Sequence, residues 1–231
     1  MIIVITGTRK GIGLYLSEYY LGKGYTVIGC SRETSELKSE KYYHYQVDVT
    51  NEKDVNLFAN SVYQKFGMID ALINNAGAAS MNHFLLTPVS TVKRLMDLNF
   101  LGTYHCVRSF INLLKKSDNP RIVNFTTVAL PLLLPGELAY AVSKSAVEAF
   151  TRMLAKEISQ FNITVNAIGP TPVATDLIAN VPKGKINNLL SQQTINRLGE
   201  FSDISNVIDF FISPASNFIT GQIIYLGGVT G

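Results

Sequence analysis

A tyrosine and a lysine stand four residues apart in the segment YAVSK, where Tyr140 is followed by Lys144. Positions four apart on a helix share one face, so the phenol and the ammonium group would lie close together. A neighbouring ammonium group favours the phenolate and lowers the pKa of a tyrosine, which lets the phenol exchange a proton with a carbonyl oxygen. The pair is a candidate acid/base centre, but such pairs are common on helix surfaces and need support from the rest of the chain.

A glycine-rich turn follows the first apolar run of the chain. The segment TGTRKGIG (6–13) comes directly after IIVI (2–5). A turn from a strand into a helix leaves backbone N–H groups unpaired at the helix start, and glycines let a pyrophosphate approach them. The spacing is G-x-x-x-G-x-G rather than G-x-G-x-x-G, and in isolation many such matches are only tight turns.

The elements that must position these residues follow from the hydrophobic pattern. Short β-branched or aromatic runs predict strands at 2–5, 26–30, 43–47, 69–74, 121–126, 163–168 and 222–226. Apolar residues at three- and four-residue spacing predict helices at about 12–22, 52–66, 88–116, 139–160 and 203–212. This alternation predicts a single α/β domain over residues 1–231, a doubly wound parallel sheet with helices on both faces. Such sheets bind ligands beyond the carboxyl ends of their strands.

The composition excludes several classes of protein. A chain of 231 residues that is 47% hydrophobic can bury one substantial core. Its apolar runs fall far short of the roughly 20 residues of a membrane helix. No small-residue cleavage site follows the first apolar run, because the glycine motif begins at Thr6, so we expect no signal peptide.

Cysteine, histidine and charge usage point to a cytoplasmic protein without metal or nucleic acid. The two cysteines, Cys30 and Cys106, match no metal or disulfide spacing and are expected to be reduced. A net charge of +3 with scattered basic residues argues against nucleic-acid binding. The histidines are too dispersed to suggest a metal site; they are His44, His83 and His105.

Five motifs in this order resemble the short-chain dehydrogenase/reductase family. They are TGTRKGIG at 6–13, DV at 48–49, NNAG at 74–77, Asn99 within a predicted helix, and YAVSK at 140–144. The tail ITGQIIYLGG (219–228) is similar to the last strand of that family, so the resemblance covers nearly the whole chain. It implies a Rossmann-like sheet of about seven strands that binds a nicotinamide dinucleotide.

The resemblance also implies which residues contact the cofactor. The pyrophosphate would lie against the glycine turn, formed by Gly7, Thr8, Arg9, Lys10, Gly11, Ile12 and Gly13. Asp48 and Val49 would border the adenine, and the ribose would be lined by Asn75, Ala76 and Gly77. Asn74 and Gly77 have the alternative role of bracing the strand ends. Contacts to the carboxamide and phosphates would come from Pro170, Val173 and Thr175.

The residues after the second strand favour NADP over NAD. An acid there binds the adenosine ribose diol and repels a 2′-phosphate, whereas an arginine does the reverse. This chain has Ser31 and Arg32 at that point and Lys10 in the glycine turn. A planar guanidinium, a hydroxyl and a second positive charge suit a phosphate, so we expect NADP(H). The alternative is that Arg32 and Lys10 are ordinary solvated surface charges.

The resemblance assigns catalytic roles to four positions. Lys144 would also hold the nicotinamide ribose, and Asn99 would hold a water in a proton relay. The family has a serine 13 positions before the tyrosine, and here that position is Thr127. Threonine keeps the hydroxyl but adds a methyl group, so we expect a narrower substrate pocket that is still catalytically active. We interpret Thr126 as a residue that merely ends a strand.

A second departure from the family follows the sixth strand. The family reads Pro-Gly where this chain has Pro170 and Thr171, followed by Pro172. Thr171 has a side chain where the family has glycine, and the proline after it favours extended backbone, so the sequence does not determine the local path of this loop. A hydroxyl contact from Thr171 is a further alternative.

We expect the residues that determine substrate specificity to lie in the loops 78–86 and 128–139 and in the segment after 176. The segment VALPLLLPGELA (128–139) is apolar, which suits either a hydrophobic substrate or packing under a lid or an oligomer interface. Residues 177–200 include Gly184 and are consistent with a mobile lid. Asp118 and Phe161 stand where acyl-carrier-protein reductases of the family tend to have basic residues, which weakens that assignment.

Together these residues predict an NADPH-dependent oxidoreductase that reversibly reduces a carbonyl of a small molecule. The resemblance implies a homodimer or homotetramer formed through the helices at 88–116 and 139–160. The main alternative is a non-catalytic NADP-binding regulatory protein, suggested by the missing serine and by the Pro-Thr pair. A purely structural α/β protein would not explain Arg32 together with the glycine turn.

Overall fold

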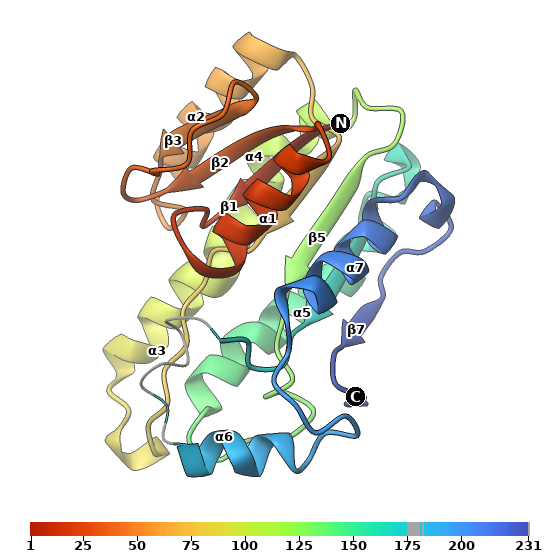
Figure 1. Cartoon of the computed structure of the whole chain (residues 1–231). Helices are drawn as coiled ribbons and strands as arrows, with labels where there is room; N and C mark the ends of the chain where they lie inside the picture. Colours follow the sequence, from red (N-terminus) through yellow and green to blue (C-terminus); the bar gives the residue numbers. More distant parts are fainter. Residues whose placement is uncertain (175–180, 182, 231) are drawn as a thin grey trace.

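A single sheet of seven parallel strands forms the centre of the computed structural model, in the order β3-β2-β1-β4-β5-β6-β7 (Figure 1). The structure describes residues 1–174, 181 and 183–230. The strands are β1 (Ile2–Thr6), β2 (Thr26–Ser31), β3 (Tyr42–Gln46), β4 (Ala71–Asn74), β5 (Arg121–Phe125), β6 (Thr164–Gly169) and β7 (Ile223–Tyr225). The predicted parallel, doubly wound sheet is confirmed.

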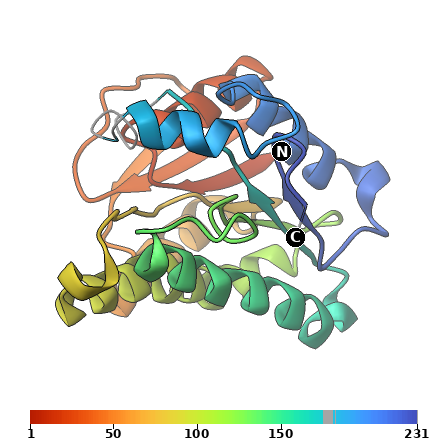
Figure 2. The same ribbon diagram turned by 90° about the horizontal axis from the view of Figure 1, so that it is seen from below.

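Helices cover both faces of the sheet (Figure 2). One face carries α1 and α7, and the other carries α2, α4 and α5. The helices are α1 (Gly11–Gly22), α2 (Glu52–Phe66), α3 (Val89–Leu95), α4 (Gly102–Leu114), α5 (Leu138–Glu157), α6 (Lys183–Leu190) and α7 (Phe201–Ile212). No helix in the described part of the chain is long and apolar enough to cross a membrane.

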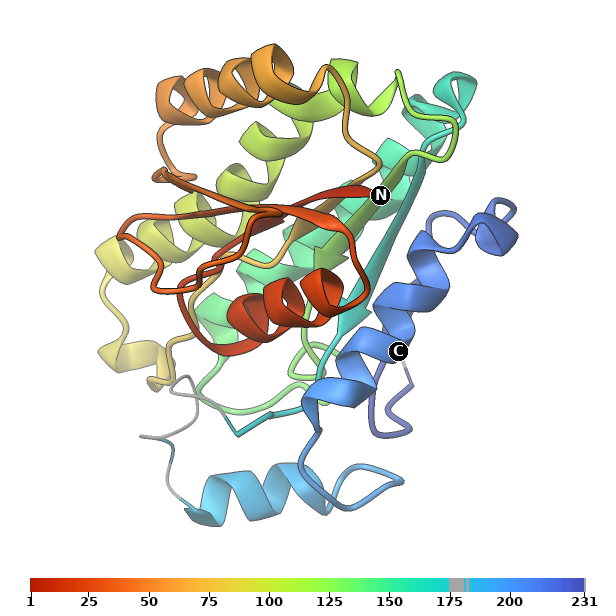
Figure 3. The same ribbon diagram turned by 45° about the horizontal axis from the view of Figure 1, so that its top comes forward.

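Two differences from the predicted elements concern the site. The helix expected over 88–116 is interrupted by a π-helical turn, η2 (Met96–Leu101), between α3 and α4. Of residues 177–200, expected as a mobile lid, 177–180 and 182 lie outside the described residues, and the described part contains the helix α6 beyond the carboxyl ends of the strands (Figures 1 and 3); the mobility of the lid stays a prediction. Short 3-10 turns complete the chain at η1 (Phe84–Leu86), η3 (Ser159–Phe161) and η4 (Pro214–Ser216).

The core consists of two clusters, one on each face of the sheet. Side chains alternate along a strand, so Val4 of β1 packs into one cluster while Ile3 and Ile5 pack into the other. All three are fully buried. Near-continuous apolar strands of this kind are expected when helices cover both faces of a parallel sheet.

The order of the strands creates the position of the site. β1 pairs with β2 on one side and with β4 on the other, so Ile5 aligns with both Gly29 and Ile73. The loops that leave β1 and β4 therefore diverge to opposite faces, and a crevice opens between them at the carboxyl edge.

Candidate functional site

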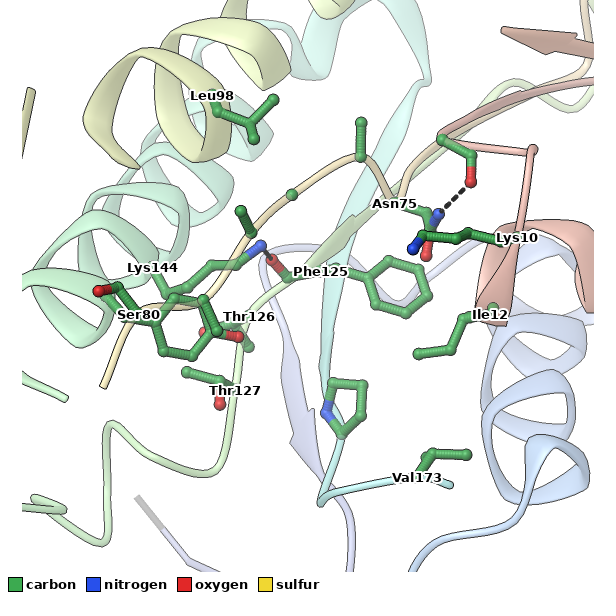
Figure 4. Close-up of a pocket in the computed structure, with 18 of the residues that line it drawn as sticks. Lys10, Ile12, Asn75, Ser80, Leu98, Phe125, Thr126, Thr127, Lys144 and Val173 are labelled. Atoms are coloured by element: carbon green, nitrogen blue, oxygen red, sulfur yellow. Dashed lines mark hydrogen bonds between the residues drawn. The ribbon is translucent and has the colours of Figure 1, made fainter. Parts of the chain in front are cut away.

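A cavity of about 710 Å³ occupies this crevice (Figure 4). In Figure 4, Lys10 and Asn75 lie toward one end, and Lys144 and Thr127 lie toward the other. Most of the predicted site residues line it, namely Gly7, Arg9, Lys10, Gly11, Ile12, Ser31, Arg32, Asp48, Val49, Asn75, Ala76, Gly77, Thr127, Tyr140, Lys144, Pro170 and Val173. Thr8, Gly13 and Asn99 do not line it, and Thr175 lies outside the described residues.

The glycine turn brings the backbone close to itself and to the next loop. Gly7 and Gly11 have positive φ angles of 75° and 60°, a conformation that other residues rarely adopt. A Cβ on Gly13 would lie 2.2 Å from the carbonyl oxygen of Gly7, so this glycine serves packing under the turn. Thr8 is fully buried, and its hydroxyl accepts a hydrogen bond from Tyr42 at 3.0 Å rather than facing the cavity.

Two asparagines at the end of β4 brace the strand ends. The Asn74 amide donates to Oδ1 of Asn124 at 2.8 Å, and the Asn75 amide donates to the carbonyl oxygen of Thr6 at 2.9 Å. Asn74 therefore has the bracing role that the sequence left open. Packing also explains why residue 77 is a glycine, because a Cβ added there would lie 2.9 Å from Oδ1 of Asn99.

Basic residues gather at the end of the cavity next to β2. Arg9, Lys10 and Arg32 all line this end, together with two acids, Glu33 and Asp48. Arg9 forms a salt bridge with Glu33 at 3.0 Å, so this acid is already neutralised by a neighbour. The Ser31 hydroxyl donates to the carbonyl oxygen of Glu33 at 2.7 Å, which fixes the turn that presents Arg32.

The lysine of the YAVSK segment is buried and held by the sheet. Lys144 is 5% exposed, and its ammonium group donates to the carbonyl oxygen of Phe125 at 2.8 Å (Figure 4). Burial lowers the pKa of Lys144 to about 8, so the side chain is still largely charged at neutral pH. This contact ties α5 to the carboxyl end of β5.

The pKa of Tyr140 is governed first by burial. Burial of the phenol raises this pKa to about 12, the hydrogen bond with Thr127 opposes the rise, and the charge of Glu137 adds to it. The Lys144 ammonium group donates to the Phe125 carbonyl oxygen, and its predicted lowering of the Tyr140 pKa stays a prediction. Tyr140 is therefore protonated at neutral pH, the form required of a proton donor.

Thr127 and Thr126 differ in what their hydroxyls contact. Thr127 is 7% exposed, lines the cavity, and makes the hydrogen bond to Tyr140 expected of the family serine. The Thr126 hydroxyl donates instead to the buried carboxylate of Glu148 at 2.6 Å, and Tyr225 donates to the same oxygen at 2.5 Å. Thr126 is thus more than a strand-ending residue, because it anchors β5 to α5 and β7.

Asn99 braces the backbone rather than facing the cavity. It lies in the π-helical turn and is fully buried. Its side-chain Oδ1 accepts from the Ala78 N–H, and its amide donates to the Ala78 carbonyl, both at 2.9 Å. The amide also donates to the Ser143 hydroxyl at 2.8 Å, one residue before Lys144. Asn99 therefore links the loop after β4 to α5.

The loop after β6 accommodates the Pro-Thr pair by lying against a neighbouring segment. Thr171 is 5% exposed and lines the cavity, while its hydroxyl is buried and has no hydrogen-bond partner among the described residues. The Gly199 N–H donates to the Pro172 carbonyl at 2.9 Å, and Val173 forms a β-bridge with Gly199. A Cβ on Gly199 would lie 2.8 Å from the Thr171 methyl group, so glycine makes room for the threonine.

Helix α6 contributes Leu189 to the lining of the cavity, and the chain after β7 packs behind it. Val229 is 8% exposed and packs in one cluster with Val128 and Leu189. The tail is held in place by a hydrogen bond of 2.9 Å from the Thr194 hydroxyl to the carbonyl oxygen of Gly228.

One residue at the Tyr140 end of the cavity is absent from the sequence-based site. Glu137 lines the cavity, is half-buried, and lies three positions before Tyr140. Burial raises the pKa of its carboxyl group, and the charge of Lys185 on α6 opposes the rise. Its spacing from Tyr140, about one helical turn, was the signal that could have pointed to it. Among the described residues, no group of three or more histidine, cysteine, aspartate or glutamate side chains could hold a metal ion.

Comparisons with known proteins agree with this fold. Residues 7–230 match the family model described as enoyl-(acyl carrier protein) reductase. A 3-oxoacyl-[acyl-carrier-protein] reductase FabG of Haemophilus influenzae is 30% identical over 98% of this chain and 96% of its own. A 3alpha-hydroxysteroid dehydrogenase of Mediterraneibacter gnavus is 27% identical over 98% of this chain and 95% of its own. The chain belongs to the short-chain dehydrogenase/reductase family.

Solved structures show the same architecture. ElxO with NADP bound superposes with a TM-score of 0.89 at 29% identity and covers 98% of this chain and 97% of its own. A 3-ketoacyl-(acyl-carrier-protein) reductase of Brucella melitensis complexed with NADH has a TM-score of 0.89 at 23% identity, covering 98% of this chain and 96% of its own. At the latter identity the likeness concerns the fold alone. The protein is thus a Rossmann-like oxidoreductase whose family supports a nicotinamide cofactor.

Proposed function

We propose that the protein is an NADPH-dependent reductase that converts a carbonyl group of a small molecule to a secondary alcohol and can catalyse the reverse reaction. The observation that carries this proposal is the single cavity of about 710 Å³ that joins the glycine turn to Thr127, Tyr140 and Lys144. Its volume lies within the range of about 300–1,000 Å³ typical of cofactor and ligand pockets.

The glycine turn fits the pyrophosphate of a dinucleotide. Helix α1 begins without a side-chain cap and without an acid in its first turn, so its N–H groups and its dipole favour an anion. Side chains are excluded at Gly7 and Gly13, which keeps the backbone accessible and tightly folded. When bound, the reduced nicotinamide supplies the hydride.

The residues at the other end supply the proton and the charge. Tyr140 donates its proton to the carbonyl oxygen, and the Thr127 hydroxyl orients that oxygen and the phenol. The ammonium group of Lys144 favours the phenolate as it forms. Asn99 holds the loop after β4 in place, and its water relay remains a prediction of the family resemblance.

Arg32 supports a preference for NADP over NAD. It lines the cavity where a 2′-phosphate would lie, together with Arg9 and Lys10. Of the two nearby acids, Glu33 is paired with Arg9, and Asp48 accepts hydrogen bonds from Thr50. Arg32→Ala should therefore weaken NADPH binding at least about tenfold while changing NADH binding little. Arg94→Ala, which removes an exposed arginine outside the cavity, is the matched control. Comparable affinity of the wild type for NADH and NADPH would exclude the preference.

The test of the whole proposal is NADPH oxidation over a panel of ketones, oxoacyl thioesters and keto-sugars. We expect turnover of at least one class, and its loss in Tyr140→Phe with NADPH binding retained. The rival function, a regulatory NADP-binding protein, is motivated by Thr127 and Thr171. It would be favoured if the wild type binds NADPH but turns over no member of the panel. Oligomerisation and a cytoplasmic location remain predictions.

A further inference from the structure

The acids that line the cavity differ in their partners. Glu33 is paired with Arg9 at 3.0 Å. The carboxylate of Asp48 accepts hydrogen bonds from the backbone N–H and hydroxyl of Thr50, at 3.0 and 2.8 Å. Glu137, by contrast, makes no side-chain hydrogen bond or salt bridge with any described residue. A half-buried carboxylate without such a partner is costly, so its presence calls for a reason.

The position of Glu137 places it beside the reacting group. It is the N-cap residue of α5 and stands three residues before Tyr140, and its side chain makes no capping hydrogen bond. Residues three apart at the start of a helix are neighbours on its surface, and Glu137 and Tyr140 both line the cavity.

The rest of the Tyr140 end of the cavity is mostly apolar. The wall around Glu137 includes Met81, Val128, Ala129 and Leu189. Lys185 of α6 is exposed, and its ammonium nitrogen would lie 3.8 Å from a Cβ on Gly136, the residue before Glu137. A substrate at Tyr140 would thus meet a single acidic side chain among the described residues of this end, beside the polar groups of Ser80, Thr127 and Lys144.

A purely structural role predicts different behaviour. An acid at a helix N-terminus interacts favourably with the helix dipole, by about 0.3–1 kcal/mol. Loss of that interaction would lower the stability of α5 and slow all substrates alike. It would not change which substrate the enzyme prefers.

We propose that Glu137 binds a hydrogen-bond donor of the substrate, a hydroxyl or an ammonium group on the carbon next to the reacting carbonyl. The inference rests on the proposed reductase function and narrows its substrate class. An ionised carboxylate can only accept hydrogen bonds, so it binds such a donor favourably. The apolar residues around it can pack against the remaining carbon chain of the substrate. A carboxylate on the substrate at the same position is repelled by Glu137.

Matched compounds test this preference by turnover and by binding. An α-hydroxyketone, an α-aminoketone and a plain ketone of equal length are compared by kcat/KM in wild type, Glu137→Gln and Glu137→Leu. The corresponding diol, amino alcohol and plain alcohol are titrated into the cofactor-loaded protein by calorimetry. We expect wild type to prefer the donor compounds, and Glu137→Leu to lower the preference ratio at least about tenfold. Glutamine keeps an acceptor oxygen without the charge, so it should lose preference for the ammonium compound more than for the hydroxyl compound.

Control experiments distinguish substrate recognition by Glu137 from the reductase activity itself. Glu157→Gln removes an exposed acid on the last turn of the same helix, outside the cavity, and should leave every ratio unchanged. If Glu137→Leu slows all three ketones equally, or if wild type prefers the plain compounds, the role of Glu137 in recognition is refuted. If no ketone is reduced, the reductase proposal fails, and the calorimetric ratios alone decide whether Glu137 binds donors.

Discussion

Thr127 keeps the hydroxyl group of the family serine but adds a methyl group beside Tyr140. Its hydroxyl shifts the pKa of Tyr140 downward, against the rise caused by burial. Because threonine restricts χ1, the hydroxyl is held toward the phenol at a smaller entropic cost than serine would need. The methyl group occupies space at the reacting end of the cavity, so it narrows the range of ketones that fit.

Substitutions at Thr127 separate the hydroxyl from the methyl group. Thr127→Ser should retain activity, whereas Thr127→Val should lower kcat at least about tenfold with NADPH affinity retained. The valine variant should also raise the pKa of Tyr140, because the stabilising hydrogen bond is removed. Steady-state kinetics, NADPH titration and the pH dependence of kcat check these points. A valine variant as active as wild type would refute the role of the hydroxyl.

Lys144 lowers stability at neutral pH, because burial disfavours its charged form. Its pKa falls from 10.5 to about 8, which corresponds to about 3 kcal/mol in favour of the unfolded state below pH 8. Between about pH 8 and about pH 10.5 the unfolded chain binds more protons than the folded one, so stability rises with pH there.

Lys144→Met should reveal this dependence. The variant has no charge to bury, so its unfolding free energy lacks that rise. We expect wild type to gain about 2 kcal/mol relative to the variant between about pH 7 and about pH 9.5, measured by urea unfolding. Parallel pH profiles for the two proteins would contradict the burial argument.

The sequence located the acid/base residues but missed Glu137. Tyr140 and Lys144 are recognisable because their spacing and neighbours form a motif, and Thr127 follows by counting back from the tyrosine. The role of Glu137 in the site depends on the segments around it, namely the loop after β4 and helix α6. These segments approach Glu137 only in the folded chain. The raised pKa of Tyr140 was likewise beyond the sequence, because burial is a tertiary property.

At the scale of the elements, the turn from β1 into α1 has the tightest packing constraint. Gly13→Ala would place a Cβ 2.2 Å from the Gly7 carbonyl oxygen and 2.6 Å from the Asn75 amide nitrogen. The Gly7 carbonyl belongs to the backbone, so it cannot move away without distorting the turn. We expect a loss of about 2–4 kcal/mol in unfolding free energy and at least tenfold weaker NADPH binding.

Gly22→Ala is the matched control in the same helix. A Cβ there meets no atom within 4 Å, so the change should be neutral or stabilising by up to about 1 kcal/mol. Thermal unfolding and NADPH titration of both variants check the contrast. Equal behaviour of the two variants would show that the turn tolerates a side chain.

Strands and amphipathic helices were predictable, whereas η2 and α6 were not. The strands and α7 carry local patterns of apolar residues that match their periodicity. Residues 88–116 keep helical spacing throughout, so nothing in that pattern marks the π-helical turn that positions Asn99. In α6, Gly184 and two adjacent asparagines are poor helix formers, and Leu189 packs on Val128, a tertiary contact that local propensity does not contain.

At the scale of the molecule, α4 and α5 present apolar side chains outward. Tyr104 on α4 is 37% exposed, and Met153 on α5 is 68% exposed. We expect these helices to form the homodimer or homotetramer interface that the family resemblance implies.

Met153→Glu should therefore shift sedimentation toward smaller species, because it places a charge in a dry interface. Leu57→Glu changes an equally exposed residue on α2 and should not. A monomeric wild type would refute the expected assembly.

The tail after β7 has a practical consequence for handling the protein. Val229 packs against Val128 and Leu189, two residues that line the cavity, whereas Met1 lies at the opposite edge of the sheet (Figure 1). A purification tag fused behind the tail would pull on a residue that supports the wall of the cavity from behind. A tag placed before Met1 leaves from the far side of the molecule, so kinetic constants should be measured on proteins tagged there.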